Sequence, residues 1–249
     1  QICAACHGLD GNSPMPQNPV LAGQVPGNFR FMVKAPRDLT TQYATRHGEQ
    51  PACEPLDAEW ATRSFIAPLV EGMDQKLGAI VFQFPPHKRG ALGGPQAFCQ
   101  RLQAFLGTLP RGPLYAVEIR NRDWLIPDYV AALCETDAVH CLSIHPRLPS
   151  LHEQMRLTGP ALQRGVVLRW NLGHGRAYED AYHRYHPFDR IVDPDPLNRD
   201  HIARLCARAA RAGKLCQISV NNKAEGSAPA SIIGLGKAIA EKMKNAVDD

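Results

Sequence analysis

Short apolar runs alternate with longer stretches of helical apolar spacing from about residue 29 to the C-terminus. Runs of this length with alternating faces are typical of strands, and they predict six strands, at 29–35, 79–84, 115–119, 140–145, 166–170 and 217–221. Helical spacing is clearest between them at 65–73, 98–109 and 202–209. Regular alternation of strand and helix predicts an α/β fold with a parallel sheet, and the size of the units suits a TIM-type barrel.

The barrel is predicted to be incomplete, because eight strands close a TIM-type barrel and six are expected here. The missing pair would precede residue 29, which leaves the first and the last predicted strand with an unpaired edge. We therefore expect residues 27–246 to form a parallel βα barrel that lacks its first two strands. Such edges lower stability and favour self-association of the chain, or they indicate a truncated or recombined gene.

Charged residues occupy one face of the third predicted strand. Glu118 and, just beyond the strand, Arg120 share a face with Ala116, whereas Val117 and Ile119 point the other way. Helical segments before and after this strand indicate a parallel sheet that is buried on both sides. The two charges therefore point into an interior, where they must be paired or must bind a ligand.

The same alternation recurs on all six strands and assigns polar residues to the inward face, close to the strand ends where barrel enzymes build their active sites. These residues are Lys34, Gln83, Glu118, Arg120, Ser143, His145, Arg169, Asn171, Ser219 and Asn221. A purely structural ion-pair network is the alternative to a ligand site, but its recurrence on six strands favours the site. Three inward Lys and Arg side chains against one Glu favour an anionic ligand, a phosphate or carboxylate, or a sugar-like molecule held by the amides.

Three of these residues are candidates for catalysis. Glu118 is the candidate general acid or base. Lys34 is an electrostatic clamp or, if neighbouring cations lower its pKa, an amine able to form a Schiff base. His145 either transfers protons or is a hydrogen-bonded core residue. An enzyme of the hydrolase, lyase or isomerase type and a non-catalytic binding module are both compatible with this set.

Composition limits which partners and which cellular compartment we expect. The formal net charge is +4 with Lys and Arg spread along the chain, and no apolar run reaches the roughly 18 residues that span a bilayer, so neither nucleic acid nor membrane is an expected partner. Thiols scattered through the barrel favour a reducing compartment, the cytoplasm. No metal site or cofactor is expected for the barrel. The chain begins at Gln1 without an initiator Met or a signal peptide, which suggests a processed product or a fragment.

A second, unrelated motif stands at the N-terminus, where Cys3-Ala-Ala-Cys6-His7 has the Cys-x-x-Cys-His spacing of c-type haem attachment. Residues 1–24 resemble small class I bacterial cytochromes c of the c4-like kind. The resemblance implies covalent haem on Cys3 and Cys6, with His7 on the iron, in an electron-transfer protein of the periplasm. It ends after about 24 residues, and Met15 lies too close to the motif to be assigned as the sixth ligand.

Four ordered motifs at the strand ends carry a further resemblance. They are Phe31-Met-Val-Lys-Ala-Pro-Arg37, Val81-Phe-Gln-Phe-Pro-Pro86, Val117-Glu-Ile-Arg-Asn-Arg-Asp-Trp124 and Val220-Asn-Asn222. Over about residues 29–245 they resemble the YecE-like family, domain of unknown function 72, which implies a TIM-type barrel. The resemblance places Lys34, Gln83, Pro85, Glu118, Arg120, Trp124, Arg169, Asn221 and Asn222 at family positions.

The resemblance adds residues to the expected binding set, and some features of the family have no counterpart in this chain. With Asn171 from the alternation, the expected substrate-binding set is Gln83, Arg120, Trp124, Arg169, Asn171, Asn221 and Asn222. The family's first strand and its acidic second-strand motif have no counterpart, and Arg169-Trp-Asn-Leu-Gly173 stands where the family has an Arg followed by His-Gly. The family's reaction is unsettled, so the resemblance implies a fold and a site without a substrate.

Overall fold

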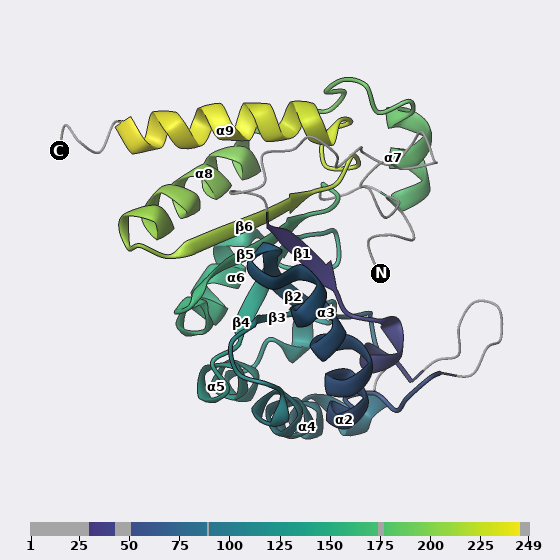
Figure 1. Cartoon of the computed structure of the whole chain (residues 1–249). Helices are drawn as coiled ribbons and strands as arrows, with labels where there is room; N and C mark the ends of the chain where they lie inside the picture. Colours follow the sequence, from purple (N-terminus) through teal and green to yellow (C-terminus); the bar gives the residue numbers. More distant parts are fainter. Residues whose placement is uncertain (1–29, 43–50, 89, 174–176, 245–249) are drawn as a thin grey trace.

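A computed structural model describes residues 30–42, 51–88, 90–173 and 177–244. Its centre is a six-stranded parallel sheet whose strands follow one another in chain order (Figure 1). The strands are β1 (Phe31–Lys34), β2 (Leu77–Phe84), β3 (Leu114–Ile119), β4 (Val139–Ile144), β5 (Gly165–Trp170) and β6 (Leu215–Val220). Within the described ranges, the six predicted strands and their parallel order are confirmed, and the bounds shift by one or two residues. The haem motif at residues 1–24 lies outside these ranges.

Helices connect successive strands and cover the outside of the curved sheet (Figure 1). The longer ones are α3 (Ala67–Met73), α4 (Gly94–Thr108), α5 (Pro127–Glu135), α6 (Leu151–Thr158), α7 (Tyr178–Tyr185), α8 (Pro196–Arg211) and α9 (Ala228–Lys244). Shorter turns are α2 (Ala58–Trp60), η1 (Arg37–Thr40), η2 (Ala61–Ile66), η3 (Asp74–Lys76), η4 (Ala91–Gly93), η5 (Arg122–Trp124) and η6 (Gly159–Leu162). Among the described residues, no helix is long and apolar enough to cross a membrane.

The alternation along the strands separates an outer from an inner layer. Large outward side chains such as Phe82 and Ile119 pack with the helices that follow β1, β2 and β3. Inward side chains are small, and Val81, Ala116 and Cys141 belong to a separate cluster inside the curve of the sheet. Small residues suit the narrow interior of a barrel. The predicted assignment of faces is therefore confirmed where the apolar residues test it.

Strands β3 and β4 separate towards their C-terminal ends, since only Ala116 and Val117 pair with β4. Buried polar side chains fill the gap. The Tyr129 hydroxyl donates to the carbonyl of Val117 at 3.1 Å and lies 2.8 Å from Nδ1 of His140. Burial lowers the pKa of His140 to about 4, so this ring is neutral at physiological pH. These bonds tie α5 to both strands at their last paired residues.

The two outer edges of the sheet, on β1 and β6, have no further strand beside them in the described part of the chain. A side chain of β6 reaches across this opening: Oε1 of Gln217 accepts a hydrogen bond from the backbone N of Ala79 in β2 at 2.7 Å. Gly78 makes room for it, because a Cβ at this position would lie 2.2 Å from Nε2 of Gln217. One side chain thus joins the last strand to the second across the open side of the barrel.

The bridge from Gln217 predicts a loss of stability in a variant of similar length that lacks the acceptor. Gln217→Met leaves the buried N–H of Ala79 unsatisfied, which should lower the free energy of unfolding by about 1–2 kcal/mol in urea denaturation. Gln100→Met, on the exposed face of α4, is the matched control and should change it by less than about 0.5 kcal/mol. Equal effects of the two variants would show that the bridge does not hold the barrel together.

Candidate functional site

Glu118, in β3, is the one acidic side chain at the centre of the predicted site, and it is fully buried. Its Oε1 lies 2.6 Å from Nη2 of Arg120, and its Oε2 accepts a hydrogen bond from Nη1 of Arg169 at 2.5 Å. A carboxylate without exposure is stable in its charged form only with such partners. Two guanidinium groups therefore share one carboxylate, which leaves the group with a net positive charge.

The parallel register brings the neighbouring residues to the same level. Gln83 in β2 pairs with Glu118, and Ser143 in β4 pairs with Arg169 in β5. The ion pair between Glu118 and Arg169 joins these two pairs of residues, so the inward polar residues of four strands lie close together. The sequence predicted this convergence from alternation alone.

Lys34, at the end of β1, belongs to the same group. Its pKa is lowered from its ordinary value of 10.5, first by burial and next by the positive charge of Arg169, while Glu118 acts in the opposite direction. Lys34 makes no ion pair within the described ranges. The neighbouring positive charge favours the neutral amine, the form that acts as a base or nucleophile, although Lys34 is exposed at the end of β1.

A cavity of about 540 Å³ opens above this group. Its lining residues are Arg120, His145, Pro146, Arg147, Arg169, Asn171, Leu172, Ala177, Tyr178, Asn221 and Lys223. Five of them were predicted as site residues, whereas Arg147, Tyr178 and Lys223 were not. Four Arg and Lys side chains and no carboxylate stand among these described lining residues. Such a lining attracts anions and repels cations.

Local hydrogen bonds fix the polar lining. Nδ2 of Asn171 donates to Oγ of Ser143 at 2.9 Å, and Nδ1 of His145 accepts from the backbone N of Arg147 at 3.2 Å. The second bond fixes Nδ1 of His145 as a hydrogen-bond acceptor. His145 is half-buried at the edge of the cavity, a position compatible with either role expected for it.

Lys223 is held by aromatic rings. It is 8% exposed, and its Nζ lies 4.2 Å from the ring centroid of Tyr178 and 5.5 Å from those of Tyr182 and Phe188. Cation–π attraction holds the ammonium group beside the cavity. Sequence reasoning missed Lys223 because it follows the last strand, where alternation no longer assigns a face. The cluster of Tyr residues in the segment that became α7 was the available signal.

Three predicted binding residues lie outside the lining. Gln83 is half-buried on the inner face below the cavity. Trp124 is buried in the outer layer, where its ring stacks on His87 at 5.4 Å with an interplanar angle of 7°. Oδ1 of Asn222 accepts from the backbone N of Ala228 at 2.8 Å and so anchors the start of α9. Trp124 and Asn222 came from the family resemblance, and the contacts of both are structural.

The remaining site predictions concern metals and haem. In the described ranges, no group of three or more His, Cys, Asp or Glu side chains is placed to hold a metal ion. Cys3, Cys6 and His7 lie outside those ranges, so the structure does not place the haem motif.

A second cavity, of about 430 Å³, is a poor candidate for the site. It lies beside α5 and η6 and is lined by Leu125, Ile126, Pro127, Val130, Ala131, Cys134, Leu157 and Pro160. No charged side chain is among these described residues, so nothing here would orient a polar ligand.

Comparisons with known proteins agree with the barrel. A family model described as a protein of unknown function, DUF72, matches residues 20–249. Crystal structures of DUF72 family proteins from Thermotoga maritima and Enterococcus faecalis superpose with TM-scores of 0.55 and 0.59, at 20% and 18% identity. Each superposition covers 86% of this chain, and 75% and 76% of the respective other chain. At this identity the similarity shows the fold.

A short similarity of a different kind involves cytochrome c4. The proteins of that name from Stutzerimonas stutzeri and Pseudomonas aeruginosa are each 50% identical to this chain over 38 residues. The matched stretch is 15% of this chain and 17% of the cytochromes, so the chain spans about a sixth of the length of these curated relatives.

Because Glu118 is buried, removing its charge should cause a large loss of stability. Glu118→Gln leaves two guanidinium groups without a counter-ion and should lower the free energy of unfolding by about 3–5 kcal/mol, or prevent folding. Glu153→Gln is the matched control, because Glu153 pairs with the exposed Arg122 at 3.1 Å and should cost less than about 1 kcal/mol. Urea denaturation measures both, and a Glu118 variant as stable as the Glu153 variant contradicts the central role of the buried carboxylate.

Proposed function

The chain belongs to the DUF72 family, and we propose that it binds a small molecule bearing a phosphate or carboxylate group at the C-terminal face of its barrel. The observation that carries this proposal is the cavity lined by Arg120, Arg147, Arg169 and Lys223, without a carboxylate among its described lining residues. An anion supplies the counter-charge that this group lacks.

The guanidinium groups offer directional contacts as well as charge. Arg120 and Arg169 each use part of a guanidinium group on Glu118, and their side chains remain 10% and 21% exposed at the cavity. A guanidinium carries five N–H donors, so each retains donors for a ligand oxygen. The amides of Asn171 and Asn221 suit hydroxyl groups, which extends the proposal to a sugar-like or sugar phosphate ligand.

Acid–base chemistry on this ligand is the catalytic part of the proposal. Glu118 accepts a proton only if a guanidinium group moves away, since both of its oxygens are engaged. The lowered pKa of Lys34 supports Lys34 as the group that exchanges a proton or attacks a carbonyl carbon, with His145 as its candidate partner. A non-catalytic binding module would use the same cavity and show no turnover.

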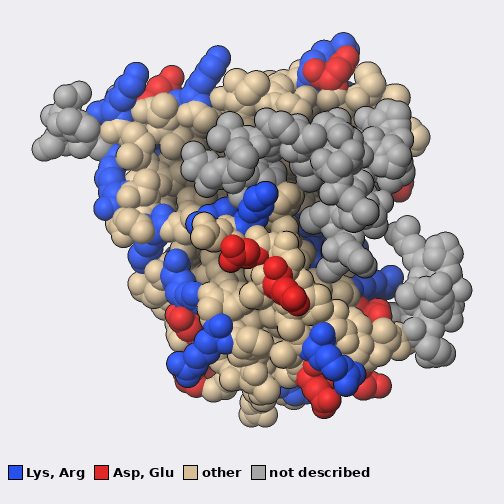
Figure 2. All heavy atoms as spheres, viewed as in Figure 1, with Lys and Arg blue, Asp and Glu red and all other residues tan. Residues whose placement is uncertain are grey.

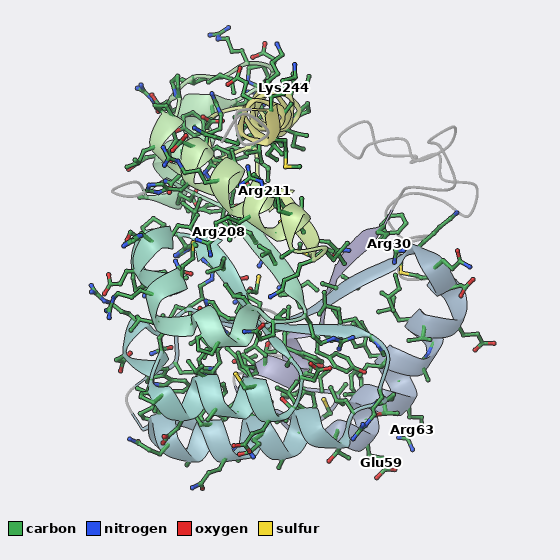
Figure 3. The ribbon with its side chains drawn as sticks, turned by 90° about the vertical axis from the view of Figure 1, so that its left-hand side faces the viewer. Arg30, Glu59, Arg63, Arg208, Arg211 and Lys244 are labelled. Atoms are coloured by element: carbon green, nitrogen blue, oxygen red, sulfur yellow. The ribbon has the colours of Figure 1, made fainter. Side chains whose placement is uncertain are left out.

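Anion binding is tested with inorganic phosphate, citrate and glucose 6-phosphate, and with glucose as the neutral control. The anionic probes should raise the melting temperature, and Arg147→Gln should weaken their binding by roughly tenfold or more in titration calorimetry, since a charge-assisted bond is lost. Arg147 is exposed, so folding should not change. Arg63→Gln is the matched control, on the outer surface away from the cavity, where Figure 3 shows Arg63 next to Glu59.

The pH dependence of phosphate binding tests Lys34 in the same experiment. A protonated amine attracts the anion, so affinity should fall as the pH rises through the pKa of Lys34, and the lowered pKa puts this fall below pH 10.5. Lys34→Met should bind more weakly and lose that fall. Equal affinity for glucose and phosphate, or equal losses in the Arg147 and Arg63 variants, would overturn the proposal.

Covalent haem at Cys3 and Cys6, with His7 on the iron, is a second candidate function. The 50% identity with cytochrome c4 over 38 residues supports it. Haem attachment would place the chain in the periplasm, whereas free thiols in the barrel fit the cytoplasm. Expression with the haem maturation system should give a c-type absorption spectrum and a haem-sized mass increase, and both should disappear in Cys3→Ser/Cys6→Ser. A colourless chain of unmodified mass would exclude this function.

A further inference from the structure

Two cysteines at the open side of the barrel have thiols in contact. Sγ of Cys216, in β6, lies 3.5 Å from Sγ of Cys206, in α8. The six cysteines that the structure describes are all free thiols, and these two form the one thiol–thiol contact among them. Cys206 is buried between α8 and the sheet, whereas Cys216 is half-buried on an edge strand. The pair therefore has a protected member and an approachable one.

The sulfur atoms are close enough that a small movement would bring them to bonding distance. A disulfide has an S–S length of about 2.05 Å, so the two atoms must approach by about 1.5 Å, a shift that side-chain rotation can supply. Both residues lie in one apolar cluster in which α8 packs on β5 and β6, so their backbones are already held together. Rotation of the two side chains, without a rearrangement of the fold, would bring the thiols to bonding distance.

We propose that Cys206 and Cys216 form a reversible disulfide that fastens the edge strand β6 to α8 when the protein meets hydrogen peroxide. The thiolate of Cys216 attacks one peroxide oxygen, which gives a sulfenic acid and releases hydroxide. The thiol of Cys206 then attacks that sulfur and releases water. In total, two thiols and one hydrogen peroxide give one disulfide and two waters, and a small dithiol restores the thiols.

The contact between the thiols indicates which cysteine reacts with peroxide and which one completes the disulfide. The hydrogen bond between them lowers the pKa of Cys216 and raises that of Cys206. The thiolate is the nucleophile, so the half-buried Cys216 is the residue that reacts first and Cys206 is the residue that resolves. This order agrees with their burial, because peroxide reaches the edge strand more easily than the space beneath α8.

The consequence for the barrel follows from the position of β6. An edge strand has unpaired backbone groups and is free to fray, and none of the six residues of β6 is fully buried, with Leu215 42% exposed. A disulfide at Cys216 removes this freedom at the start of the strand. The inference concerns the stability of β6 and is independent of the ligand proposed above.

Peptide mapping of the intact folded chain tests the proposal. After exposure to hydrogen peroxide and alkylation of the remaining thiols, trypsin without reductant cleaves after Arg204, Arg208, Lys214 and Lys223. Peptides 205–208 and 215–223 should then appear joined, two hydrogens lighter than their sum, and should separate on reduction. The oxidised protein should melt roughly 3–8 °C higher, and dithiothreitol should reverse this shift.

Serine variants supply the controls. Cys134→Ser, at an exposed thiol on α5, should keep the linked peptide and the thermal shift, whereas Cys206→Ser and Cys216→Ser should lose both. The proposal fails if Cys216 links to another cysteine. It also fails if both thiols of the wild-type chain stay reduced while Cys134 is oxidised. These outcomes are measured on the wild-type chain, so the test remains decisive even if a variant folds poorly.

Discussion

The pairing of one buried carboxylate with two guanidinium groups is the constraint on which the site depends. Glu118 has no exposure, and its charge is tolerable only because Arg120 and Arg169 meet its two oxygens. The ion pairs connect the end of β3 with β5 across the interior, although β4 lies between them in the sheet. They also leave one positive charge in excess, which Lys34 and the cavity above experience. Structural integrity and the proposed affinity for anions would thus have the same origin.

Periodicity was sufficient to predict the fold and the inward face of each strand. Apolar side chains with a period of two settled which residues of each strand face the helices, and Lys34, Glu118 and Arg169 then had to share the opposite face. Parallel order placed these residues towards the same end of the sheet. Nothing in this inference required side-chain detail, which explains why it succeeded on six separate strands.

The rest of the site lies where periodicity ends. Arg147 and Lys223 belong to loops beyond β4 and β6, and the path of a loop depends on contacts that a local pattern does not encode. Trp124 is the opposite case, because it belongs to a strand-end motif and was predicted to bind the substrate. The turn η5 instead directs its ring outwards against His87. The distribution of surface charge does not help to locate the candidate site. Figure 2 shows both signs spread over the visible face, and Figure 3 shows Arg208, Arg211 and Lys244 on α8 and α9.

The aromatic rings around Lys223 connect the cavity to α7. The ammonium that lines the cavity is the same one that attracts Tyr178 and Tyr182, both of which belong to that helix. The proposed anion would therefore compete with the rings for a single cation. Because such competition is reciprocal, occupancy of the cavity and attachment of the helix are thermodynamically linked. A substitution at Tyr182, which is in α7 and is not among the described lining residues, would then alter the affinity for the proposed anion through Lys223.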